Sequence, residues 1–502
     1  MDRIRCEKLK EKIMSAKEAA KLINDGDFVG TSGFAPAGYP KAIPMALAKR
    51  VDEGENLQID LMTGASVGPE LDGLLSEKGI IRRRYPYQTN SSLRNNINKG
   101  NVKYNDMHLS HSAQYLNYGF LENMDVAVIE AVAITEEGGI VPSTSIGNSN
   151  IFVECAKKVI VEINTSQPLE LEGVHDIYSP LNPPNRQSIN INTTSDRIGT
   201  YYIPCKVEKI VAIVITDIPD KTNKVTAIDD VSKRMAENLI KFLESEVEKG
   251  RLPINLLPLQ SGVGSVANAV LGGLCNSNFT NLDVYSEVLQ DSVVDLMDCG
   301  KINTASATSL TISPERIKDF KENFSKYKSH IILRPEEISN NPEVIRRLGI
   351  ISMNTAIEAD IYGHVNSTHI MGSKMMNGIG GSGDFTRNAY ISVFTTASTA
   401  KDGKISSIVP FVSHVDHTEH DVMVIVTENG VADLRGLSPK ERAEKIIENC
   451  AHEDYKAMLW DYFNRAKEAT ENSHSPHLLN EALSWHERFI KTGTMRLQKK
   501  GR

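Results

Sequence analysis

Residues 258–290 read PLQSGVGSVANAVLGGLCNSNFTNLDVYSEVLQ, which places a glycine-rich turn, an apolar helix, a short strand and one carboxylate in a single stretch. Gly262 and Gly264 permit a tight turn that a ligand can approach closely. The apolar residues after them predict a helix whose first N–H groups face out of the turn, where an oxyanion or a phosphate binds readily. The strand LDVYSEV would bring Glu287 to the same edge of a sheet. Backbone donors beside a carboxylate indicate acyl chemistry with Glu287 as the nucleophile.

A glycine turn before an apolar helix also occurs in proteins that bind dinucleotides. Residues 262–267 have the G-x-G-x-x-A spacing, and Glu287 follows at about the twenty-residue distance of a ribose-binding acid. The preceding PINLLPLQ is interrupted by prolines and makes a poor first strand for such a fold. No Gly-Lys-Ser/Thr follows the turn, so the segment is not a Walker loop either. A dinucleotide-dependent oxidoreductase stays open as an alternative from a different class.

Length and composition are those of a large soluble enzyme. The 502 residues, 40% hydrophobic and 24% charged, can fill two or more cores. The net charge of −8 argues against a nucleic-acid partner. Apolar runs such as IVAIVI at 210–215 are too short to cross a bilayer, and the charged N-terminus has no features of a secretory or transit peptide. Six scattered cysteines favour reduced thiols over a disulfide framework. We therefore expect a cytoplasmic protein.

Apolar strands alternate with helices along the whole chain. The predicted strands are short and β-branched, as in parallel sheets that are covered on both faces; they lie at 57–62, 126–132, 158–163, 209–215, 348–354, 389–398, 405–412 and 421–427. A helix follows Ile228, two more occupy 440–449 and 453–470, and the Pro- and Asn-rich segment 168–192 predicts an irregular excursion. The pattern predicts two α/β domains, residues 1–223 and 224–502.

Five motifs in one order carry a family resemblance. They are SGVGSVANAVL (261–271), YSEVLQDS (285–292), MNGIGGSGDF (376–385), IVPFVSHVDHTEHDV (408–422) and TENGVADLRG (427–436). The chain resembles the acetyl-CoA hydrolase/transferase family, and within it the bacterial succinyl-CoA:acetate and succinyl-CoA:coenzyme A transferases. This resemblance implies two CoA-transferase-type (NagB-like) α/β domains with largely parallel sheets and an active site between them.

The resemblance also implies roles for single residues. Glu287 matches the glutamate that forms the acyl anhydride and the glutamyl-CoA thioester. Val263 and Gly381 match the residues whose N–H groups form the oxyanion hole. A carboxylate with an ordinary pKa near 4 is ionised at neutral pH, so Glu287 would need no partner base. Contacts to coenzyme A are expected from Leu259, Gln260, Ser261, Gly262, Gly264, Asn340, Asn377 and Lys401, whereas Lys221 replaces an arginine of related chains.

Two other features compete for the catalytic role. Glu428, in Thr427-Glu428-Asn429-Gly430, resembles the S-E-N-G motif that holds the nucleophile in a sister class of CoA-transferases. The residues alone favour Glu287 because the glycine turn lies just upstream, and the family pattern leaves Glu428 as an acid that faces the substrate or supports the site. The segment His414–His420 holds three histidines and two acids, as a metal centre would. The family match favours a polar turn and no metal.

We therefore expect a CoA-transferase that moves CoA between a short-chain acyl-CoA and a carboxylate by a ping-pong reaction through Glu287. An acyl-CoA hydrolase that uses the same glutamate is the nearest alternative, and a non-catalytic CoA sensor is another. No tightly bound cofactor is expected, since coenzyme A is itself substrate and covalent intermediate. The expected partners are small-molecule substrates and a second copy of the chain in a homodimer.

Overall fold

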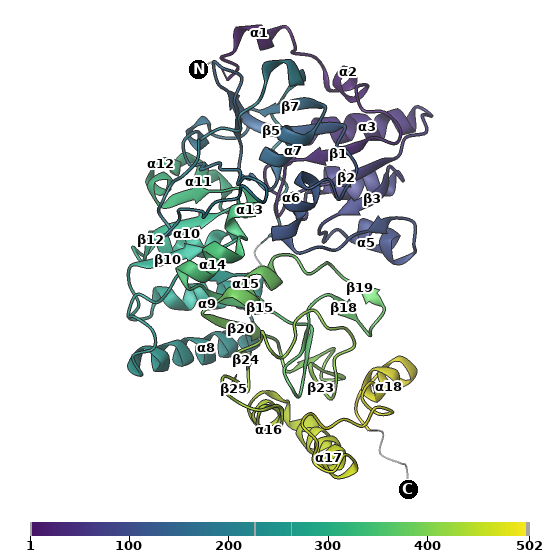
Figure 1. The fold of residues 1–502 in the computed structure, drawn as a ribbon, viewed down its shortest axis with the longest axis vertical. Helices are drawn as coiled ribbons and strands as arrows, with labels where there is room; N and C mark the ends of the chain where they lie inside the picture. The colour runs from purple at the N-terminus through teal and green to yellow at the C-terminus, as the bar shows by residue number, and fades with distance from the viewer. Residues whose placement is uncertain (1–2, 225–226, 263, 498–502) are drawn as a thin grey trace. The chain divides into compact units, whose positions relative to one another are not determined.

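The structure of the protein is a computed structural model that describes residues 3–224, 227–262 and 264–497 (Figure 1). The chain forms two compact units. Unit 1 comprises Met1–Val225, Asn281–Leu348 and Asn377–Asp384, and unit 2 comprises Thr226–Thr280, Gly349–Met376 and Phe385–Arg502. Each unit is assembled from three separate stretches of the chain. The domains expected from the sequence were the continuous ranges 1–223 and 224–502.

Unit 1 is built on a parallel sheet of strands whose residues are almost all buried. Seven strands pair in the order β4-β3-β2-β1-β5-β7-β8, and β6 pairs antiparallel with β5. Their bounds are β1 Phe28–Thr31, β2 Ile59–Met62, β3 Ile81–Tyr85, β4 Lys103–Tyr104, β5 Val126–Ile134, β6 Ile140–Pro142, β7 Lys158–Asn164 and β8 Ile210–Thr216. The order reverses at β1, so the loop that follows β1 lies at a topological switch point, where α/β proteins commonly bind ligands.

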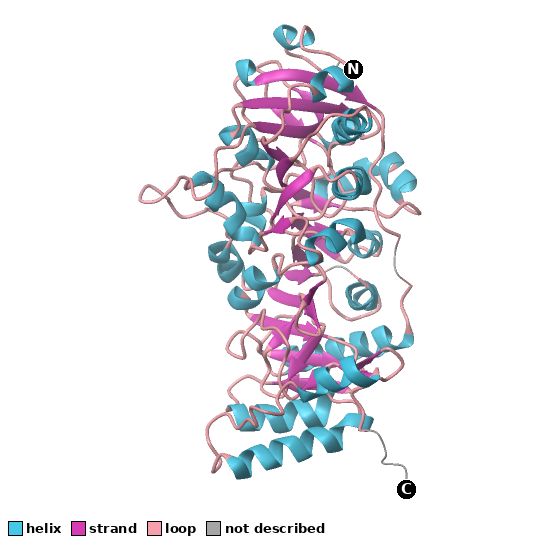
Figure 2. Ribbon diagram, turned by 90° about the vertical axis from the view of Figure 1, so that its right-hand side faces the viewer, coloured by secondary structure: helices cyan, strands magenta, loops and turns pink. Residues whose placement is uncertain are grey.

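Helices cover both faces of this sheet (Figure 2). Helices α2 (Ala16–Ala20), α3 (Ala42–Asp52) and α4 (Leu74–Glu77) contribute to one apolar core with the strands. On the other face α7 (Ser149–Cys155) contacts β1 and β5. Coverage on both sides explains why the strands read as continuous apolar runs rather than as alternating ones.

A second set of strands in unit 1 carries the candidate nucleophile. Strands β10 (Leu282–Tyr285), β12 (Ile302–Ala307) and β14 (Ile331–Leu333) pair in parallel, with β12 in the centre. Beyond their carboxyl ends, β11 (Val288–Leu289) pairs in parallel with β13 (Ser309–Leu310). Glu287 therefore lies at the carboxyl end of β10, in the bend that leads into β11, as expected from the sequence.

Unit 2 contributes a further set of parallel strands. Strands β9 (Leu259–Ser261), β15 (Ile351–Thr355), β20 (Ile391–Thr395) and β24 (Val424–Thr427) pair in parallel, and β25 (Gly430–Asp433) closes the edge antiparallel to β24. The long helices are α8 (Asp230–Glu248), α9 (Ser265–Cys275), α16 (Pro439–Cys450) and α17 (Glu453–Ala469). A separate apolar core packs α16 and α17 against the short strands β16 (Glu358–Asp360) and β23 (Ile408–Val409).

The single strand predicted over 405–412 is wrong. The segment forms two short strands in different sheets, β22 (Ile405–Ser406), which pairs with β21 (Thr399–Ala400), and β23, which pairs with β16. Ser407 between them bonds through its N–H to Ser398 O at 3.0 Å, and Pro410 has no N–H to continue a ladder. The mixed fold of largely parallel sheets is confirmed. No helix among the described residues is both long and apolar enough to span a membrane.

A buried charge cluster fixes the loop that follows β1. The ammonium of Lys41 is fully buried and pairs with the carboxylates of Glu130 and Asp220. Burial alone would lower the pKa of Lys41, but Asp220 and Glu130 outweigh that effect and raise it. Asp220 also accepts hydrogen bonds from Gly38 N at 3.2 Å and from Thr144 Oγ1 at 2.8 Å. The loop after β1 is thus bound to Glu130 of β5 and to Asp220, near the end of the first stretch of unit 1.

We expect Lys41→Met to lower the free energy of unfolding by ~3–5 kcal/mol, because it leaves two carboxylates buried without their cation. Urea unfolding followed by circular dichroism measures this change. Lys157→Met is the matched control, since Lys157 is 66% exposed in its pair with Asp125 and solvent screens that pair, so its loss should change the free energy of unfolding far less. Equal effects of the two substitutions would show that the buried cluster does not stabilise the fold.

Candidate active site

The backbone holds Glu287 in a fixed bend. Its carbonyl oxygen accepts hydrogen bonds from Thr308 N and Ser309 N, both at 3.1 Å. The next residue, Val288, packs in a small apolar cluster with Phe34, Ala65 and Leu109. Glu287 itself is only partly exposed.

Two hydrogen-bond donors from distant parts of unit 1 meet at the Glu287 carboxylate. Asn340, which follows α13 (Glu336–Ser339), donates from Nδ2 to Glu287 Oε1 at 2.9 Å. Gly381, in the glycine-rich loop before α15 (Ser382–Asn388), donates its backbone N–H to the same carboxylate. The site therefore joins residues 287, 340 and 381 of one unit.

Position 381 requires glycine for a steric reason. A Cβ there would collide with Glu287 Oε1 and with Asn340 Nδ2. Gly381 can bring its N–H against the carboxylate only because it has no side chain. Two neighbouring glycines also allow a close approach, since a Cβ at Gly378 in this loop would meet Tyr104 and Asp106, and one at Gly383 in α15 would meet His108.

The expectation that Glu287 has an ordinary pKa near 4 is wrong. Burial raises the pKa of Glu287 to about 7, and the hydrogen bonds from Asn340 and Gly381 oppose this rise only in part. Desolvation disfavours the ionised form, whereas both donors favour it. The sequence showed the residue type and the strand but not the burial that removes water from the carboxylate.

Two further carboxylates are buried near Glu287, and the sequence interpretation missed both. Asp384 accepts hydrogen bonds from Ser110 and from Asn340. Glu336 accepts from Ser112 Oγ at 2.8 Å and from Asn148 Nδ2 at 3.2 Å. Burial raises the pKa of Asp384 to about 7 and the pKa of Glu336 well above its usual range. Asp384 is the acid of the GIGGSGDF run, which was the only available signal.

One segment of unit 1 holds the glycine-rich loop in place. Tyr104 Oη donates to Asn377 O at 2.8 Å, and Asp106 accepts from Ile379 N at 2.9 Å. Leu109 N donates to Gly380 O at 3.3 Å, and Ser110 binds Asp384. Successive contacts along 104–110 therefore match successive residues of 377–384, and the position of Gly381 is set by this pairing.

The glycine turn singled out in the sequence belongs to unit 2. Leu259 and Gln260 are buried in β9, and Gln260 Oε1 accepts from Met353 N at 3.1 Å. Gly264 has φ of 132° and precedes the first residue of α9, a conformation that suits glycine. Val263, predicted to form part of the oxyanion hole, lies outside the described residues.

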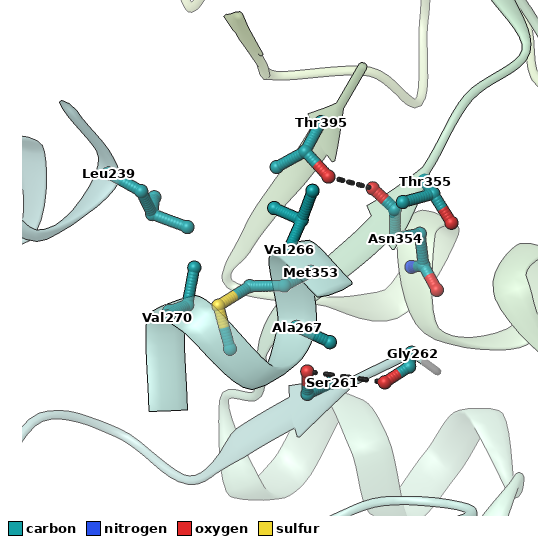
Figure 3. Close-up of a pocket in the computed structure, with 10 residues that line it drawn as sticks. All are labelled: Leu239, Ser261, Gly262, Val266, Ala267, Val270, Met353, Asn354, Thr355 and Thr395. Carbon is teal, nitrogen blue, oxygen red and sulfur yellow. Dashed lines mark hydrogen bonds between the residues drawn. The ribbon is translucent and has the colours of Figure 1, made fainter. Parts of the chain in front are cut away.

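A small cavity in unit 2 lies beside this turn (Figure 3). Strands β9, β15 and β20 and helices α8 and α9 line it through Leu239, Ser261, Gly262, Val266, Ala267, Val270, Met353, Asn354, Thr355 and Thr395. Ser261 Oγ bonds to Gly262 O and Thr395 Oγ1 to Asn354 O, both at 3.4 Å. Apolar side chains from the helices and polar groups from the strand ends therefore face one space.

The other predicted residues lie in separate surroundings, Lys401 and Glu428 in unit 2 and Asn377 and Lys221 in unit 1. Lys401 is exposed, with its ammonium 5.2 Å from the centre of the Phe489 ring. Glu428 follows β24 and accepts from Ser398 N at 2.9 Å and from Ser398 Oγ at 2.5 Å. Asn377, in unit 1, is partly buried and lies 3.5 Å from Tyr87 Oη through its Nδ2. Lys221 pairs with Glu70 of unit 1.

The histidine-rich segment is a hydrogen-bonded turn of unit 2. Asp416 accepts from Ser367 N at 2.6 Å and from Thr368 Oγ1 at 2.9 Å, and His414 Nε2 lies 3.3 Å from Asp416 Oδ1. His417 is buried, whereas His420 is exposed. Within the part of the chain that the structure describes, no group of three or more His, Cys, Asp or Glu side chains is placed to hold a metal ion. That catalysis needs no metal stays a prediction.

Comparison with known proteins shows the family. The model of the acetyl-CoA hydrolase/transferase N-terminal domain matches residues 1–215, and that of the C-terminal domain matches 317–463. A succinyl-CoA:acetate CoA-transferase of Clostridium kluyveri is 60% identical, with 98% of this chain and 92% of that protein covered. A propanoyl-CoA:succinate CoA transferase of Escherichia coli is 48% identical, with coverage of 96% and 98%. An acetyl-CoA hydrolase of Schizosaccharomyces pombe is 46% identical, with coverage of 97% and 99%.

Solved structures support the fold. RipA from Yersinia pestis matches with a TM-score of 0.71 at 22% identity, covering 92% of this chain and 98% of that one. A 4-hydroxybutyrate CoA-transferase from Porphyromonas gingivalis matches with a TM-score of 0.64 at 22% identity, covering 91% and 99%. The family indicated by the sequence motifs is confirmed. The chain belongs to the acetyl-CoA hydrolase/transferase family of enzymes, and its fold is that of the CoA-transferases.

Proposed function

We propose that the protein is a CoA-transferase that moves CoA between a short-chain acyl-CoA, such as succinyl-CoA or acetyl-CoA, and a carboxylate such as acetate or succinate. The observation that carries this proposal is the partly buried Glu287 carboxylate held by Asn340 and Gly381. The names of the Clostridium kluyveri and Escherichia coli relatives support transfer between an acyl-CoA and a carboxylate.

In the first step the ionised Glu287 attacks the thioester carbonyl of the acyl-CoA. A new C–O bond forms and the C–S bond breaks. CoA departs as a thiolate, and Glu287 is now part of an acyl-glutamyl anhydride. The substrate carbonyl passes through an oxyanion, for which the N–H groups of Gly381 and Val263 are the proposed donors. Removing one such donor in other enzymes costs roughly 3–4 kcal/mol of transition-state stabilisation.

In the second step the thiolate attacks the anhydride at the carboxyl carbon of Glu287. The negative charge now develops on an oxygen of Glu287 itself, where Asn340 Nδ2 and the Gly381 N–H already point. Collapse of this intermediate breaks the C–O bond, forms the glutamyl-CoA thioester, and releases the first acid with one oxygen from Glu287. An incoming carboxylate reverses both steps and takes the CoA away.

We assign the contacts to coenzyme A to Leu259, Gln260 and Ser261 of β9, to Gly262 and Gly264 of the turn that follows it, to Asn340 and Asn377, and to Lys401. The exposed ammonium of Lys401 suits a phosphate or the pantetheine arm. Glu428 is proposed to support the site. A homodimer without a tightly bound cofactor, acting in the cytoplasm, completes the proposal.

Hydrolysis is the second candidate function, because relatives in Schizosaccharomyces pombe and Saccharomyces cerevisiae are named acetyl-CoA hydrolase. A hydrolase needs a general base that activates water near the anhydride. Asp384 is the acid linked to Glu287 through Asn340, and its two oxygens already accept from Ser110 and Asn340. This arrangement favours transfer.

Enzyme incubated with acyl-CoA alone should gain the mass of CoA less one water on the peptide that contains Glu287. Mass spectrometry of the quenched digest measures this adduct. Glu287→Ala should abolish the adduct and reduce turnover by at least ~10³-fold. Glu428→Gln is the control and should keep the adduct on Glu287. An adduct on Glu428 would show that Glu428, and not Glu287, is the nucleophile.

Activity should fall as pH drops through about 7, since only ionised Glu287 attacks and burial raises its pKa to about 7. The profile of kcat/KM for acetyl-CoA between pH 5 and 9 should lose about tenfold per pH unit below ~6 and be level above ~8. Asn340→Ala should move the inflection upward, because the hydrogen bond from Asn340 lowers the Glu287 pKa. A profile that stays flat down to pH 5 would contradict the raised pKa.

Transfer should exceed hydrolysis. With acetate or succinate present, acyl exchange should outrun release of free thiol by at least ~100-fold, the scale set by the lack of one general base. Chromatography of the acyl-CoA products and a thiol assay on the same reaction measure the two rates. Thiol release that is equally fast with and without a carboxylate acceptor would make the protein a hydrolase.

A further inference from the structure

A second acid of unit 1 is bound to the same amide as the nucleophile. Asp384 is 5% exposed and lies in the first turn of α15. Its Oδ2 accepts hydrogen bonds from Ser110 N at 3.0 Å and from Asn340 Nδ2 at 3.3 Å, and its Oδ1 accepts from Ser110 Oγ at 2.5 Å. Asp384 therefore contacts the same Asn340 amide that donates to Glu287.

The hydrogen bonds of Asn340 specify which end of its amide faces Glu287. Nδ2 donates to Glu287 Oε1 at 2.9 Å and to Asp384 Oδ2 at 3.3 Å, whereas Oδ1 accepts from Ser339 Oγ at 2.9 Å. The two ends of an amide have the same shape, so only its partners choose between the two orientations. A reversed amide would turn Oδ1, which cannot donate, toward two carboxylates. Asp384 thus adds a second acceptor on the side where Glu287 needs a donor.

We propose that Asp384 is a positioning residue that keeps the NH₂ group of Asn340 directed at Glu287. The inference rests on the proposed function, in which charge develops on the oxygen of Glu287 that Asn340 contacts. When Glu287 becomes an anhydride or a thioester it is no longer a carboxylate, and its own pull on the Asn340 amide weakens. Asp384 and the anchoring Ser110 then hold the donor in place through the covalent stages.

The role needs an acceptor at the Oδ2 position and not a negative charge. Burial raises the pKa of Asp384 to about 7, and the negative charge of Glu287 adds to the rise. An asparagine at 384 could place its oxygen where Oδ2 lies and its NH₂ against Ser110 Oγ, because a hydroxyl can accept as well as donate. The conservative variant should therefore restore what an alanine removes.

The full-length enzyme tests this inference with Asp384→Ala, Asp384→Asn, Asn340→Ala and the double variant Asp384→Ala/Asn340→Ala. Steady-state kcat and KM for acetyl-CoA and the rate of CoA adduct formation on Glu287 are measured for each. Asp384→Ala should lower kcat by ~10–100-fold, less than the 10²–10³-fold loss typical of deleting an oxyanion donor. Its KM should stay within about threefold, because the contact acts after binding. Asp384→Asn should stay within about threefold of the wild type in kcat.

The double variant separates positioning from general support of the fold. Asp384 should have no further effect once Asn340 is absent, so the double variant should be as active as Asn340→Ala alone. Losses that multiply, or an Asp384→Asn variant as slow as Asp384→Ala, would overturn the inference. Ser110→Ala provides a second test of the inference in case Asp384→Ala folds poorly. It removes only the hydroxyl that binds Oδ1 and should slow kcat by ~2–10-fold in the wild-type but not in the Asn340→Ala background.

A readout without catalysis distinguishes failure of this inference from failure of the proposed function. In protein labelled with ¹⁵N only in asparagine, the side-chain resonances of Asn340 are identified by their loss in Asn340→Ala. They should shift in Asp384→Ala relative to the wild type and in Ser110→Ala to a smaller extent. Unchanged resonances in Asp384→Ala would overturn the positioning role. Shifted resonances in an enzyme that never forms the Glu287 adduct would instead overturn the proposed transferase.

Discussion

The carboxylate of Glu287 must lose water and still carry charge, and the rest of the site depends on this constraint. Burial removes solvent from this carboxylate and raises the pKa of Glu287 to about 7. Asn340 and Gly381 offset part of that penalty with two fixed donors. A desolvated carboxylate is a stronger nucleophile than one in water, and preorganised donors lower the cost of charge on its oxygen without further rearrangement.

Chain topology explains how distant residues meet at Glu287. Parallel strands deliver their carboxyl ends to one edge, so the bend after β10 lies beside the start of β13 and the loops around β1. The segment 104–110 then pairs with 377–384 contact by contact and carries Gly381 and Asp384 to the same place. The glycines of that loop are needed because each lets backbone approach a neighbouring side chain. The second apolar core, around α16 and α17, belongs to unit 2 and is formed separately.

Periodicity and motifs in the sequence predicted much of the fold and part of the site. The runs at 126–132 and 158–163 could be predicted as strands because buried parallel strands are apolar on both faces. Glu287 lies at the end of a strand, as expected. The prediction of one strand over 405–412 was wrong, because the residues before and after Ser407 pair with strands of two different sheets. Asp384, Ser110 and the raised pKa of Glu287 were not predictable, because they arise from contacts between residues 44 to 274 positions apart. Propensity carries no information on such contacts.

The fate of oxygen atoms tests covalent catalysis by Glu287 most directly. The enzyme is given acetyl-CoA and succinate labelled with ¹⁸O in both oxygens of its carboxylates, and the peptide that contains Glu287 is weighed after turnover. The proposed sequence of anhydride and thioester leaves one oxygen of the acceptor carboxylate in Glu287 each time CoA departs as the new acyl-CoA. We expect one ¹⁸O atom in Glu287 after a single turnover and two after many, and none in the Glu428 peptide. A Glu287 peptide without label after many turnovers would contradict the account.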